Sequence, residues 1–364
     1  MSEIIVNGTI LDTKPTGLGI YTLNIINQLN FSKKKCALFT SIDYNMNDQI
    51  HVIKTTKFVR PYPYKKFGGI LRFLINQTYF TFLAMRYKLA YLPTPHGSIF
   101  LKNQVVTVHD LLALHFPKQH KLQYYYYKFF MPFILKNAKY IISISESTKQ
   151  DLIKFYNLPP EKIRVVHNGF DRKHFTYKVD AKDYIEKKYN LTKFIFAVGS
   201  SYPHKNIERL IISFKDLNMK DLKLVLTGQI GENQKAIISK YNISNVVFLG
   251  YIDFNDLPYF YSAAIAMVYP SLYEGFGFPP LEAMSCNCPV VVSNTSSLPE
   301  VCSDAVEYIN PYDTNSITHG ILKVINDDSY RNDLIQKGQL QVCKFNWEQT
   351  CQEIMKVFQE AIQE

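Results

Sequence analysis

The stretch that decides the fold is PSLYEGFGFPPLEAM, residues 270–284. It follows the apolar run 264–269, which is typical of a buried parallel strand. Pro279 and Pro280 favour a first helical turn, so a helix is predicted to open there with Glu282 in its first turn. The two glycines between strand and helix allow positive φ, or close approach of a ligand to the backbone. The stretch therefore predicts a strand, a glycine loop and a helix.

The glycine loop is Gly275-Phe276-Gly277. It is predicted to direct backbone N–H groups to one place at the positive end of the next helix, an arrangement that binds phosphate. Glu274 and Glu282 flank the loop, and carboxylates are good acceptors for sugar hydroxyls. A diphosphate between two polyol rings would satisfy both features, which describes a nucleotide-sugar. The alternative is that Glu282 only complements the helix dipole and Glu274 is solvated.

The stretch resembles the E-x7-E signature of retaining glycosyltransferases of family GT4. The resemblance implies an α/β protein of the GT-B fold, with two Rossmann-like doubly wound domains facing a central cleft and a C-terminal helix crossing back to the first domain. It implies that Glu282 holds the ribose hydroxyls, and that Glu274 holds the donor sugar with the N–H groups of Phe276 and Gly277. Gly275 and Leu281 belong to the same donor site.

The length and charge of the chain bound its class. Its 364 residues are long for one core and suit two domains. The net charge of +10 favours an anionic partner, which could be a nucleic acid, a sugar-nucleotide or an acidic lipid surface. The N-terminal residues show no secretion signal, and no apolar run approaches the length of a membrane span. We therefore expect a cytoplasmic protein.

The cysteines and histidines predict no metal site. Six cysteines show no metal-ligand spacing, and nine histidines form no zinc-binding motif. We expect free thiols, no metal and no cofactor, with the nucleotide-sugar acting as a co-substrate.

Both halves of the chain alternate short β-branched runs with amphipathic ones, which is typical of open parallel α/β sheets. Residues 1–172 are predicted to form an acceptor-binding domain, closed by a helix from about 347–364. Residues 173–346 are predicted to form the nucleotide-sugar-binding domain, after a polar boundary at 170–190 where strand signals vanish.

Lys205 lies between a predicted strand and a predicted helix. A lysine there can neutralise a diphosphate as a point charge, which the transfer needs because a nucleoside diphosphate leaves. The alternative is a solvated loop lysine. The segment PHKN, residues 203–206, matches the K-N motif of the family. Ser200 and Ser201 stand where many members supply an Arg, so Lys205 and backbone N–H groups are expected to hold the diphosphate.

His109 follows the apolar run 104–108 and stands at the carboxyl end of a predicted strand, where open α/β sheets bind ligands. The alternative is a structural histidine, with Asp110 capping the next helix. The segment resembles the family stretch whose histidine hydrogen-bonds the donor sugar near the reacting carbon. The resemblance assigns that role to His109.

Three weaker motifs accompany these residues. Gly17 and Gly19 lie at a strand-to-helix turn, which is an ordinary tight turn or, by resemblance, the loop that approaches the donor phosphate or the acceptor. Tyr251 follows a predicted strand whose end binds the base in relatives, largely through backbone groups. Residues 167–171, HNGFD, resemble the hinge between the two domains.

Residues 60–88 and 118–139 interleave Lys and Arg with aromatic residues, and single helices are predicted at 71–85 and 124–137. Cations and aromatics on one helix face suit a lipid headgroup boundary. Single-stranded nucleic acid would bind the same pattern, and buried helices with solvated lysines are the plain alternative. Beside a glycosyltransferase site, we expect a lipid-linked acceptor, an anionic membrane surface and no nucleic acid.

The sequence thus predicts a retaining hexosyltransferase at the inner face of the cell membrane. Its donor is a nucleotide-sugar, with GDP-mannose favoured by the resemblance of the His109 segment to mannosyl- and rhamnosyltransferases. Its acceptor is a lipid-linked oligosaccharide or a polysaccharide in the synthesis of O-antigen, capsule or exopolysaccharide. The alternatives are a UDP- or dTDP-sugar donor, a non-catalytic protein that binds nucleotide-sugars, and a nucleic-acid-binding protein.

Overall fold

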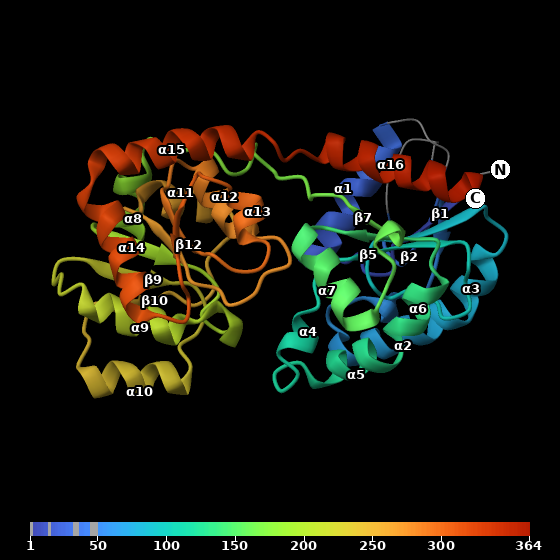
Figure 1. Cartoon of the computed structure of the whole chain (residues 1–364), viewed down its shortest axis with the longest axis horizontal. Coiled ribbons are helices and arrows are strands. Elements are labelled where there is room, and N and C mark those ends of the chain that lie inside the picture. Colours follow the sequence, from blue (N-terminus) through green and yellow to red (C-terminus); the bar gives the residue numbers. More distant parts are fainter. Residues whose placement is uncertain (1–2, 14–15, 32–35, 44–49) are drawn as a thin grey trace. The chain divides into compact units, whose positions relative to one another are not determined.

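A computed structural model describes residues 3–13, 16–31, 36–43 and 50–364. The chain divides into two compact units. Unit 1 consists of Met1–Gly169 and Asn346–Glu364, and unit 2 consists of Phe170–Phe345. The division falls three residues before the boundary expected after residue 172. Each unit is a parallel sheet with helices on both faces (Figure 1).

The described residues of unit 1 contain a 7-stranded sheet in the order β3-β2-β1-β4-β5-β6-β7, with every neighbouring pair parallel. The strands are β1 (Ile4–Asn7), β2 (Cys36–Thr40), β3 (Ile50–Lys54), β4 (Leu89–Leu92), β5 (Gln104–Val108), β6 (Tyr140–Ser143) and β7 (Ile163–Val165). The helices are α1 (Gly17–Phe31), α2 (Lys65–Gln77), α3 (Tyr79–Ala84), α4 (Leu112–His115), α5 (Lys121–Phe129), α6 (Met131–Asn137), α7 (Glu146–Tyr156) and α16 (Trp347–Gln363).

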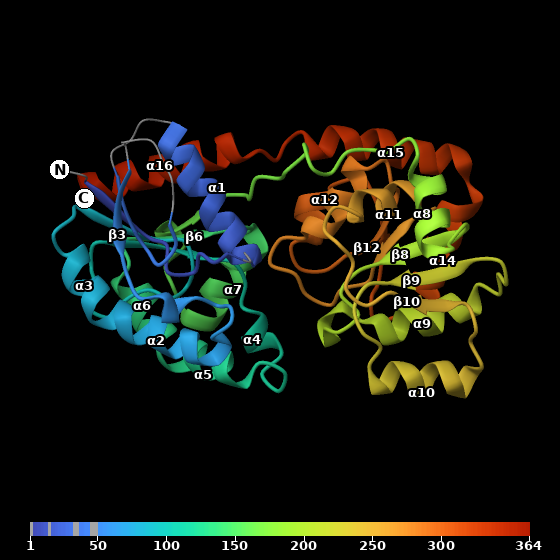
Figure 2. The same ribbon diagram turned by 180° about the vertical axis from the view of Figure 1, so that it is seen from behind.

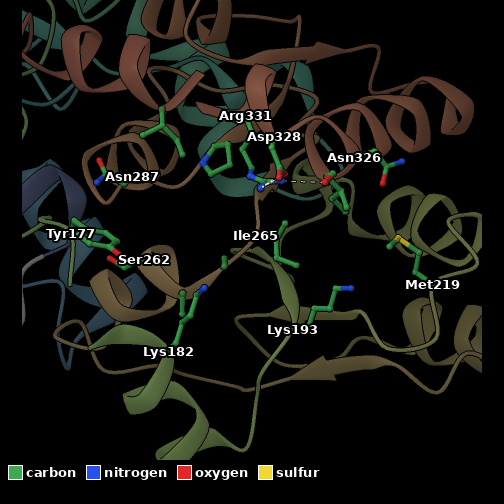
Figure 3. A pocket seen from close by; sticks show the side chains of 15 residues that line it. Tyr177, Lys182, Lys193, Met219, Ser262, Ile265, Asn287, Asn326, Asp328 and Arg331 are labelled. Atoms are coloured by element: carbon green, nitrogen blue, oxygen red, sulfur yellow. Dashed lines mark hydrogen bonds and ion pairs between the residues drawn. The ribbon is translucent and has the colours of Figure 1, made fainter. Parts of the chain in front are cut away.

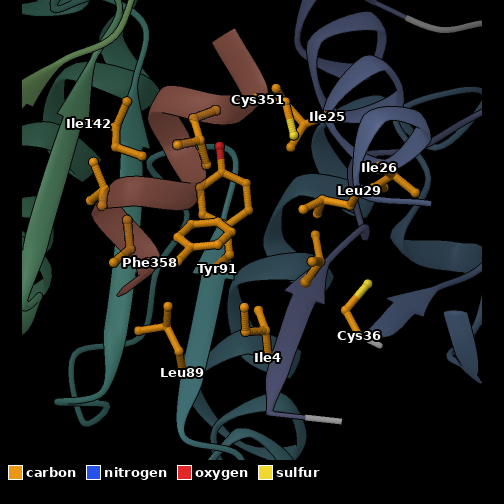
Figure 4. Packing of buried hydrophobic residues seen from close by; sticks show 14 of the residues in the cluster. Ile4, Ile25, Ile26, Leu29, Cys36, Leu89, Tyr91, Ile142, Cys351 and Phe358 are labelled. Carbon is orange, nitrogen blue, oxygen red and sulfur yellow. The ribbon is translucent and has the colours of Figure 1, made fainter. Parts of the chain in front are cut away.

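The last helix of the chain, α16, completes the core of unit 1 (Figure 4). It covers one face of the sheet together with α1. Phe358 of α16 is fully buried, and its ring centroid lies 4.8 Å from that of Tyr91 in β4. Truncating such a side chain to Ala typically costs about 3–5 kcal/mol. The expected return of the C-terminal helix to the first domain is therefore confirmed.

The other face of this sheet is covered by α2, α3, α5 and α6, as the two opposite views show (Figures 1 and 2). The single helices predicted at 71–85 and 124–137 are wrong. The first is interrupted at Thr78, whose φ of −117° and ψ of −92° are not helical. The second is interrupted at Phe130, because Pro132 at the start of α6 has no N–H to continue the hydrogen-bond ladder.

The described residues of unit 2 contain a 6-stranded parallel sheet in the order β10-β9-β8-β11-β12-β13. The strands are β8 (Phe194–Ala197), β9 (Lys223–Leu226), β10 (Val246–Phe248), β11 (Met267–Tyr269), β12 (Val290–Ser293) and β13 (Glu307–Ile309). The helices are α8 (Ala181–Tyr189), α9 (Ile207–Asp216), α10 (Glu232–Tyr241), α11 (Leu257–Ala263), α12 (Phe278–Ser285), α13 (Leu298–Cys302), α14 (Thr314–Asn326) and α15 (Asp328–Val342).

Four elements of unit 2 were not predicted from the sequence: α8, α13, α14 and β13. Helix α8 lies inside the polar stretch 170–190 and buries only Ala181 and Ile185, so its apolar periodicity is weak. Strand β13 is a three-residue strand at the edge of the sheet. Helix α8, the five-residue α13 and β13 have few apolar residues to produce a readable pattern, whereas α14 buries Ile317, Ile321 and Val324 and was missed all the same. Among the described residues, no helix is long and apolar enough to cross a bilayer.

Candidate functional site

The strand order of unit 2 reverses between β8 and β11. Open α/β sheets bind ligands at the carboxyl ends of the strands beside such a reversal. The loop after β8 carries Lys205, and the loop after β11 carries Glu274. Lys205 and Glu274, two residues of the predicted donor site, therefore lie at the edge of the sheet where ligands are expected to bind.

Lys205 and Glu274 form an ion pair. The Lys205 Nζ atom lies 2.6 Å from Oε1 of Glu274, and the two side chains are only 14% and 13% exposed. Neither side chain is solvated, so the alternatives of a solvated acid and a solvated loop lysine are wrong. Within the described ranges, two of the three Lys205 N–H groups are used, by Glu274 and by the hydroxyl oxygen of Tyr269. One donor of the ammonium remains for a ligand.

The Glu274 carboxylate is held from one side. Ser271 Oγ donates to its Oε1 atom at 2.5 Å, and Tyr269 Oη donates to the same atom at 2.9 Å. Among the described residues, every hydrogen bond to this carboxylate ends on Oε1, which leaves Oε2 for a ligand. Burial alone would raise the pKa of Glu274, but the charge of Lys205 and these hydrogen bonds bring it below its ordinary value. Glu274 is thus an ionised acceptor.

Two serines before α13 hold the backbone on either side of Gly275. Ser296 Oγ accepts a hydrogen bond from the Glu274 N–H at 2.9 Å. Ser297 Oγ donates to the carbonyl oxygens of Glu274 and Phe276, at 3.0 and 2.8 Å. Sequence reasoning missed both serines, because a serine pair in a loop carries no motif of its own.

The two loops at the reversal are joined by hydrogen bonds. Asn206 is buried, and its Nδ2 atom donates to the carbonyls of Pro270 and Pro311 at 3.1 and 2.7 Å. The Leu272 N–H donates to the carbonyl of His204 at 2.7 Å. Gly199 has a φ of +83°, and a Cβ there would lie 3.3 Å from the Lys205 stem. The loops therefore hold Lys205 and Glu274 in register.

Helix α12 begins earlier than predicted. Gly277, with a φ of +110°, is its N-cap residue, and Phe278 is its first residue. Glu282 consequently lies beyond the first turn, so the prediction that it occupies that turn is wrong, and a role in complementing the helix dipole is not supported. Two prolines in the first turn carry no N–H, so the first turn of this helix offers few donors.

Glu282 has a different environment from Glu274. The Tyr261 hydroxyl donates to its Oε2 atom at 2.7 Å. Among the described residues, this is the hydrogen bond that holds the carboxyl group, and Oε1 is left for a ligand. Burial raises the pKa of Glu282 to about 7, although the bond from Tyr261 and the charge of Lys205 both lower it. Glu282 is therefore poised between its two protonation states near neutral pH.

Three further residues of the predicted donor site in unit 2 differ in the solvent exposure of their side chains. Leu281 is fully buried, so only its backbone could contact a ligand. Ser200 is also buried, and its hydroxyl donates to the Gln229 carbonyl at 3.1 Å. Tyr251 is 92% exposed at the carboxyl end of β10. Of these three, Tyr251 alone presents its side chain to solvent.

In unit 1, His109 follows β5 and lies in edge contact with Tyr21, with ring centroids 4.6 Å apart. Its Nε2 atom lies 2.8 Å from the Pro93 carbonyl oxygen. Because a carbonyl only accepts, Nε2 carries the proton and the neutral ring presents Nδ1 as an acceptor. Burial lowers the pKa of His109 to about 4. Asp110 Oδ1 accepts the Leu112 N–H at 3.0 Å, although the N-cap residue of α4 is Leu111 and not Asp110.

The first glycine motif lies at the start of α1, where Gly17 is the first helical residue. A Cβ atom at Gly17 would meet nothing within 4 Å, so internal packing does not demand glycine there. The Gly19 N–H donates to Thr16 Oγ1 at 3.4 Å. Lys14 and Pro15, which precede these glycines in the sequence, lie outside the described residues.

A hollow of about 640 Å³ lies at the opposite edge of the unit 2 sheet (Figure 3). It is lined by Lys193 and Ile265, which precede β8 and β11, and by Lys182 and Arg331. Arg331 is paired with Asp328 at 2.5 Å. This hollow therefore lies at the amino ends of the strands that carry Lys205 and Glu274 at their carboxyl ends. In the described part of the chain, no group of three or more His, Cys, Asp and Glu could hold a metal ion.

The arrangement in unit 2 offers complementary groups for a sugar diphosphate. An ionised carboxylate oxygen can accept hydroxyls, one ammonium N–H can donate to a phosphate oxygen, and a second carboxyl group titrates near pH 7. Hydrogen bonds that involve charged groups are roughly twice as strong as neutral ones. The geometry therefore suits a ligand with hydroxyls on both sides of an anionic centre.

Two family models match the sequence. The model of glycosyltransferase family 4 matches residues 15–174, and the model of glycosyl transferases group 1 matches residues 180–341. The O-antigen chain mannosyltransferase RfbU of Salmonella typhimurium is 34% identical over 255 residues, which cover 68% of this chain and 69% of that protein. The O-antigen chain mannosyltransferase B of Escherichia coli is 29% identical over 360 residues, covering 92% and 93%.

The fold is also found among solved structures. A sucrose-phosphate synthase from Thermosynechococcus elongatus superposes with a TM-score of 0.74 at 20% sequence identity, and 98% of each chain is covered. The predicted α/β architecture of two doubly wound domains is confirmed.

Proposed function

The chain belongs to glycosyltransferase family 4, with the GT-B fold, and from that premise we propose that it transfers mannose from GDP-mannose to a bacterial surface glycan. Two relatives that match most of the chain are O-antigen chain mannosyltransferases, which supports mannose as the sugar and O-antigen as the glycan. We propose GDP, and not UDP or dTDP, as the nucleotide of the donor because the proposed sugar is mannose.

The observation that carries the proposal is the buried Lys205–Glu274 pair beside the strand reversal. Glu274 Oε2 accepts hydroxyls of the transferred sugar, and the remaining N–H of Lys205 donates to a diphosphate oxygen. Because Lys205 and Glu274 together are neutral, the Gly277 N–H is proposed as a further donor for the developing negative charge.

The nucleoside is proposed to bind on the other side of the diphosphate. Glu282 accepts the ribose hydroxyls through its carboxylate form, which gives donor binding a dependence on pH near 7. The exposed Tyr251 at the end of β10 contacts the base. Gly275 and Gly277 let the diphosphate approach the backbone between the two carboxylates.

The transfer is proposed to retain the anomeric configuration of the donor. In the proposed site, the ionised Glu274 serves as an acceptor of hydroxyls rather than as an acid. We favour front-face attack, in which the acceptor hydroxyl bonds to the anomeric carbon while the bond to the diphosphate breaks and a phosphate oxygen takes the acceptor proton. The role of His109 in binding the donor sugar, and that of Gly17 and Gly19, stay predictions from the resemblance.

The acceptor is proposed to be a lipid-linked glycan, and the enzyme to work at the inner face of the membrane. The family relatives that extend O-antigen chains support this assignment. No metal or other cofactor is part of the proposed reaction.

The proposal is tested by incubating the purified chain with GDP-mannose, UDP-glucose or dTDP-rhamnose and a lipid-linked acceptor. We expect mannose transfer alone, and NMR of the product to show the donor's anomeric configuration. The Glu274→Gln variant should lose transfer, whereas Glu232→Gln, which alters an exposed Lys–Glu pair of the same unit, should not. Transfer by Glu274→Gln at the parent rate, or inversion at the anomeric carbon, would contradict the proposal.

A further inference from the structure

The positive charge of the chain is concentrated in one segment. Residues 49–145 contain 14 Lys and Arg and a single acidic residue, Asp110, so the segment carries 14 − 1 = 13 positive charges. The whole chain carries +10. The rest of the chain is thus slightly acidic, and the excess of positive charge belongs to unit 1.

Helix α2 in this segment has its apolar side chains on the outside. Phe67, Ile70 and Leu74 repeat at helical spacing and are 61%, 60% and 52% exposed. Its buried positions hold Arg72 and Asn76, which bind the carbonyls of Val59 and His96 at 2.7 Å each. A surface helix in water has the reverse arrangement. The outer surface of α2 therefore suits an apolar neighbour.

Helices α3 and α5 also expose aromatic side chains. Phe82 of α3 is 64% exposed, and Tyr125 and Phe129 of α5 are 55% and 54% exposed. Cations accompany the rings. The Arg86 guanidinium lies 5.2 Å from the centroid of Phe82, and Lys128 Nζ lies 5.6 Å from that of Phe129. These helices are therefore buried on one face and expose aromatic rings beside cations on the other.

These helices form one layer. Phe73 of α2 lies 5.9 Å from Tyr126 of α5 and 4.9 Å from Phe130, measured between ring centroids. Both overall views place α2, α3, α5 and α6 on the same side of the unit 1 sheet (Figures 1 and 2). We name as the outer helical face the exposed side chains Phe67, Ile70, Leu74, Phe82, Tyr125 and Phe129.

We propose that the outer helical face docks on a membrane leaflet that contains anionic lipid. Apolar and aromatic side chains enter the boundary between headgroups and acyl chains, while Lys and Arg keep their charges at the phosphates. Each cation near an anionic surface contributes about 1 kcal/mol of attraction. The face thereby brings unit 1 to the surface where a lipid-linked acceptor would lie, and only this last consequence rests on the proposed function.

Other occupants fit the face less well. A second copy of the chain would oppose one strongly positive surface to another, and like charges disfavour that contact. Single-stranded nucleic acid would stack on the rings but would leave the aliphatic Ile70 and Leu74 without a partner. Anionic lipid is the occupant that uses the aliphatic side chains, the aromatic rings and the cations together.

Co-sedimentation with vesicles tests the proposal. We expect the full chain to bind phosphatidylcholine vesicles containing phosphatidylglycerol at low salt, and to bind pure phosphatidylcholine vesicles much less. A Leu74→Glu/Phe82→Glu variant should bind at least about tenfold more weakly. The matched control is Val179→Glu/Leu340→Glu, which adds the same charge at side chains of unit 2 that are 87% and 70% exposed, and should bind as the parent does.

Failure of this inference is distinguishable from failure of the proposed function. Absence of binding to anionic vesicles, or equal loss in both double variants, overturns the docking face. A dimer detected by light scattering and dissociated by Leu74→Glu/Phe82→Glu would assign the face to a second copy instead. Vesicle binding without mannose transfer would leave the face standing and overturn the mannosyltransferase proposal. Transfer to a short water-soluble acceptor should be the same for the parent and both double variants.

Discussion

Glu274 and Glu282 flank one glycine loop, yet their surroundings give their carboxyl groups opposite properties. Glu274 forms an ion pair with Lys205 and accepts hydrogen bonds from two hydroxyls, and its pKa lies below the ordinary value. Glu282 accepts one hydrogen bond from Tyr261, and burial raises its pKa to about 7. Burial acts on both groups in the same direction. The close ammonium therefore decides which one stays ionised.

The two groups also affect stability with opposite signs. Glu274 has a folded pKa below its unfolded one, so its contribution is present above about pH 4.5 and is lost as the pH falls through the folded pKa. Glu282 has a raised folded pKa, so the folded state loses stability as the pH rises from about 4.5 to about 7. The burial of Glu282 therefore lowers the stability of the folded protein near neutral pH, as expected for a binding site in which a ligand supplies the missing partner of the carboxylate.

The largest expected effect is on catalysis. Glu274→Gln removes the ionised acceptor and should lower kcat/KM about 100- to 1000-fold, the range seen when one transition-state contact is lost. The Lys205→Met variant should lower kcat/KM by a factor in the same range. Initial rates with GDP-mannose and circular dichroism of each variant would measure both effects, and a folded Lys205→Met with parental kcat/KM would contradict the proposed role.

The next effect is on stability. Lys205→Met leaves the buried Glu274 carboxylate without its counter-charge and should cost about 3 kcal/mol. The double variant Lys205→Met/Glu274→Gln should recover most of this loss but no activity. Urea unfolding followed by circular dichroism gives the coupling energy. The exposed pair Glu232–Lys235 is the control and should show no measurable coupling. Equal coupling in both pairs would mean that burial does not matter here.

A smaller effect concerns pH. In the proposed function the ribose binds the ionised form of Glu282, so GDP affinity should increase as the pH rises from 6 to 8, by about tenfold. Glu282→Gln should abolish this dependence. It should also remove the loss of stability between pH 4.5 and 7, on the order of 2 kcal/mol. Isothermal titration at several pH values would measure the affinity, and an unchanged pH profile in Glu282→Gln would assign the titration to another group.

The smallest effect sharpens the same contrast. The bond from Tyr261 lowers the pKa of Glu282, so Tyr261→Phe should raise that pKa and weaken GDP binding about threefold at pH 7. Binding at pH 9 should be nearly unchanged, since Glu282 is ionised there in both proteins. A threefold loss that persists at pH 9 would show that Tyr261 acts by packing and not through the carboxyl group.

Much of the site could be predicted because it lies in short contiguous motifs. Residues 270–284 and 203–206 each contain a strand end or a helix start together with a chemical group, so local patterns place Glu274 and Lys205 at the carboxyl edge of the sheet. The partners of these groups could not be predicted. Tyr269, Tyr261, Ser296 and Ser297 are ordinary residues whose roles depend on contacts across the sheet.

The same division holds for the helices of unit 1. Their aromatic and basic composition was readable, and it left a lipid surface, a nucleic acid and a buried core as alternatives. The burial of single side chains favours a surface role for α2, because Arg72 and Asn76 face inward and Phe67, Ile70 and Leu74 face outward.

By itself, the sequence determined the two doubly wound domains, the family and the positions of the chemical groups, because strand periods, glycines and prolines act over a few residues. Only the tertiary structure decided that Lys205 is already paired, that the carboxyl groups of Glu274 and Glu282 have opposite pKa shifts, and that α2 is apolar on its outside. Those properties depend on burial and on charges from distant segments, which act through space and not along the chain.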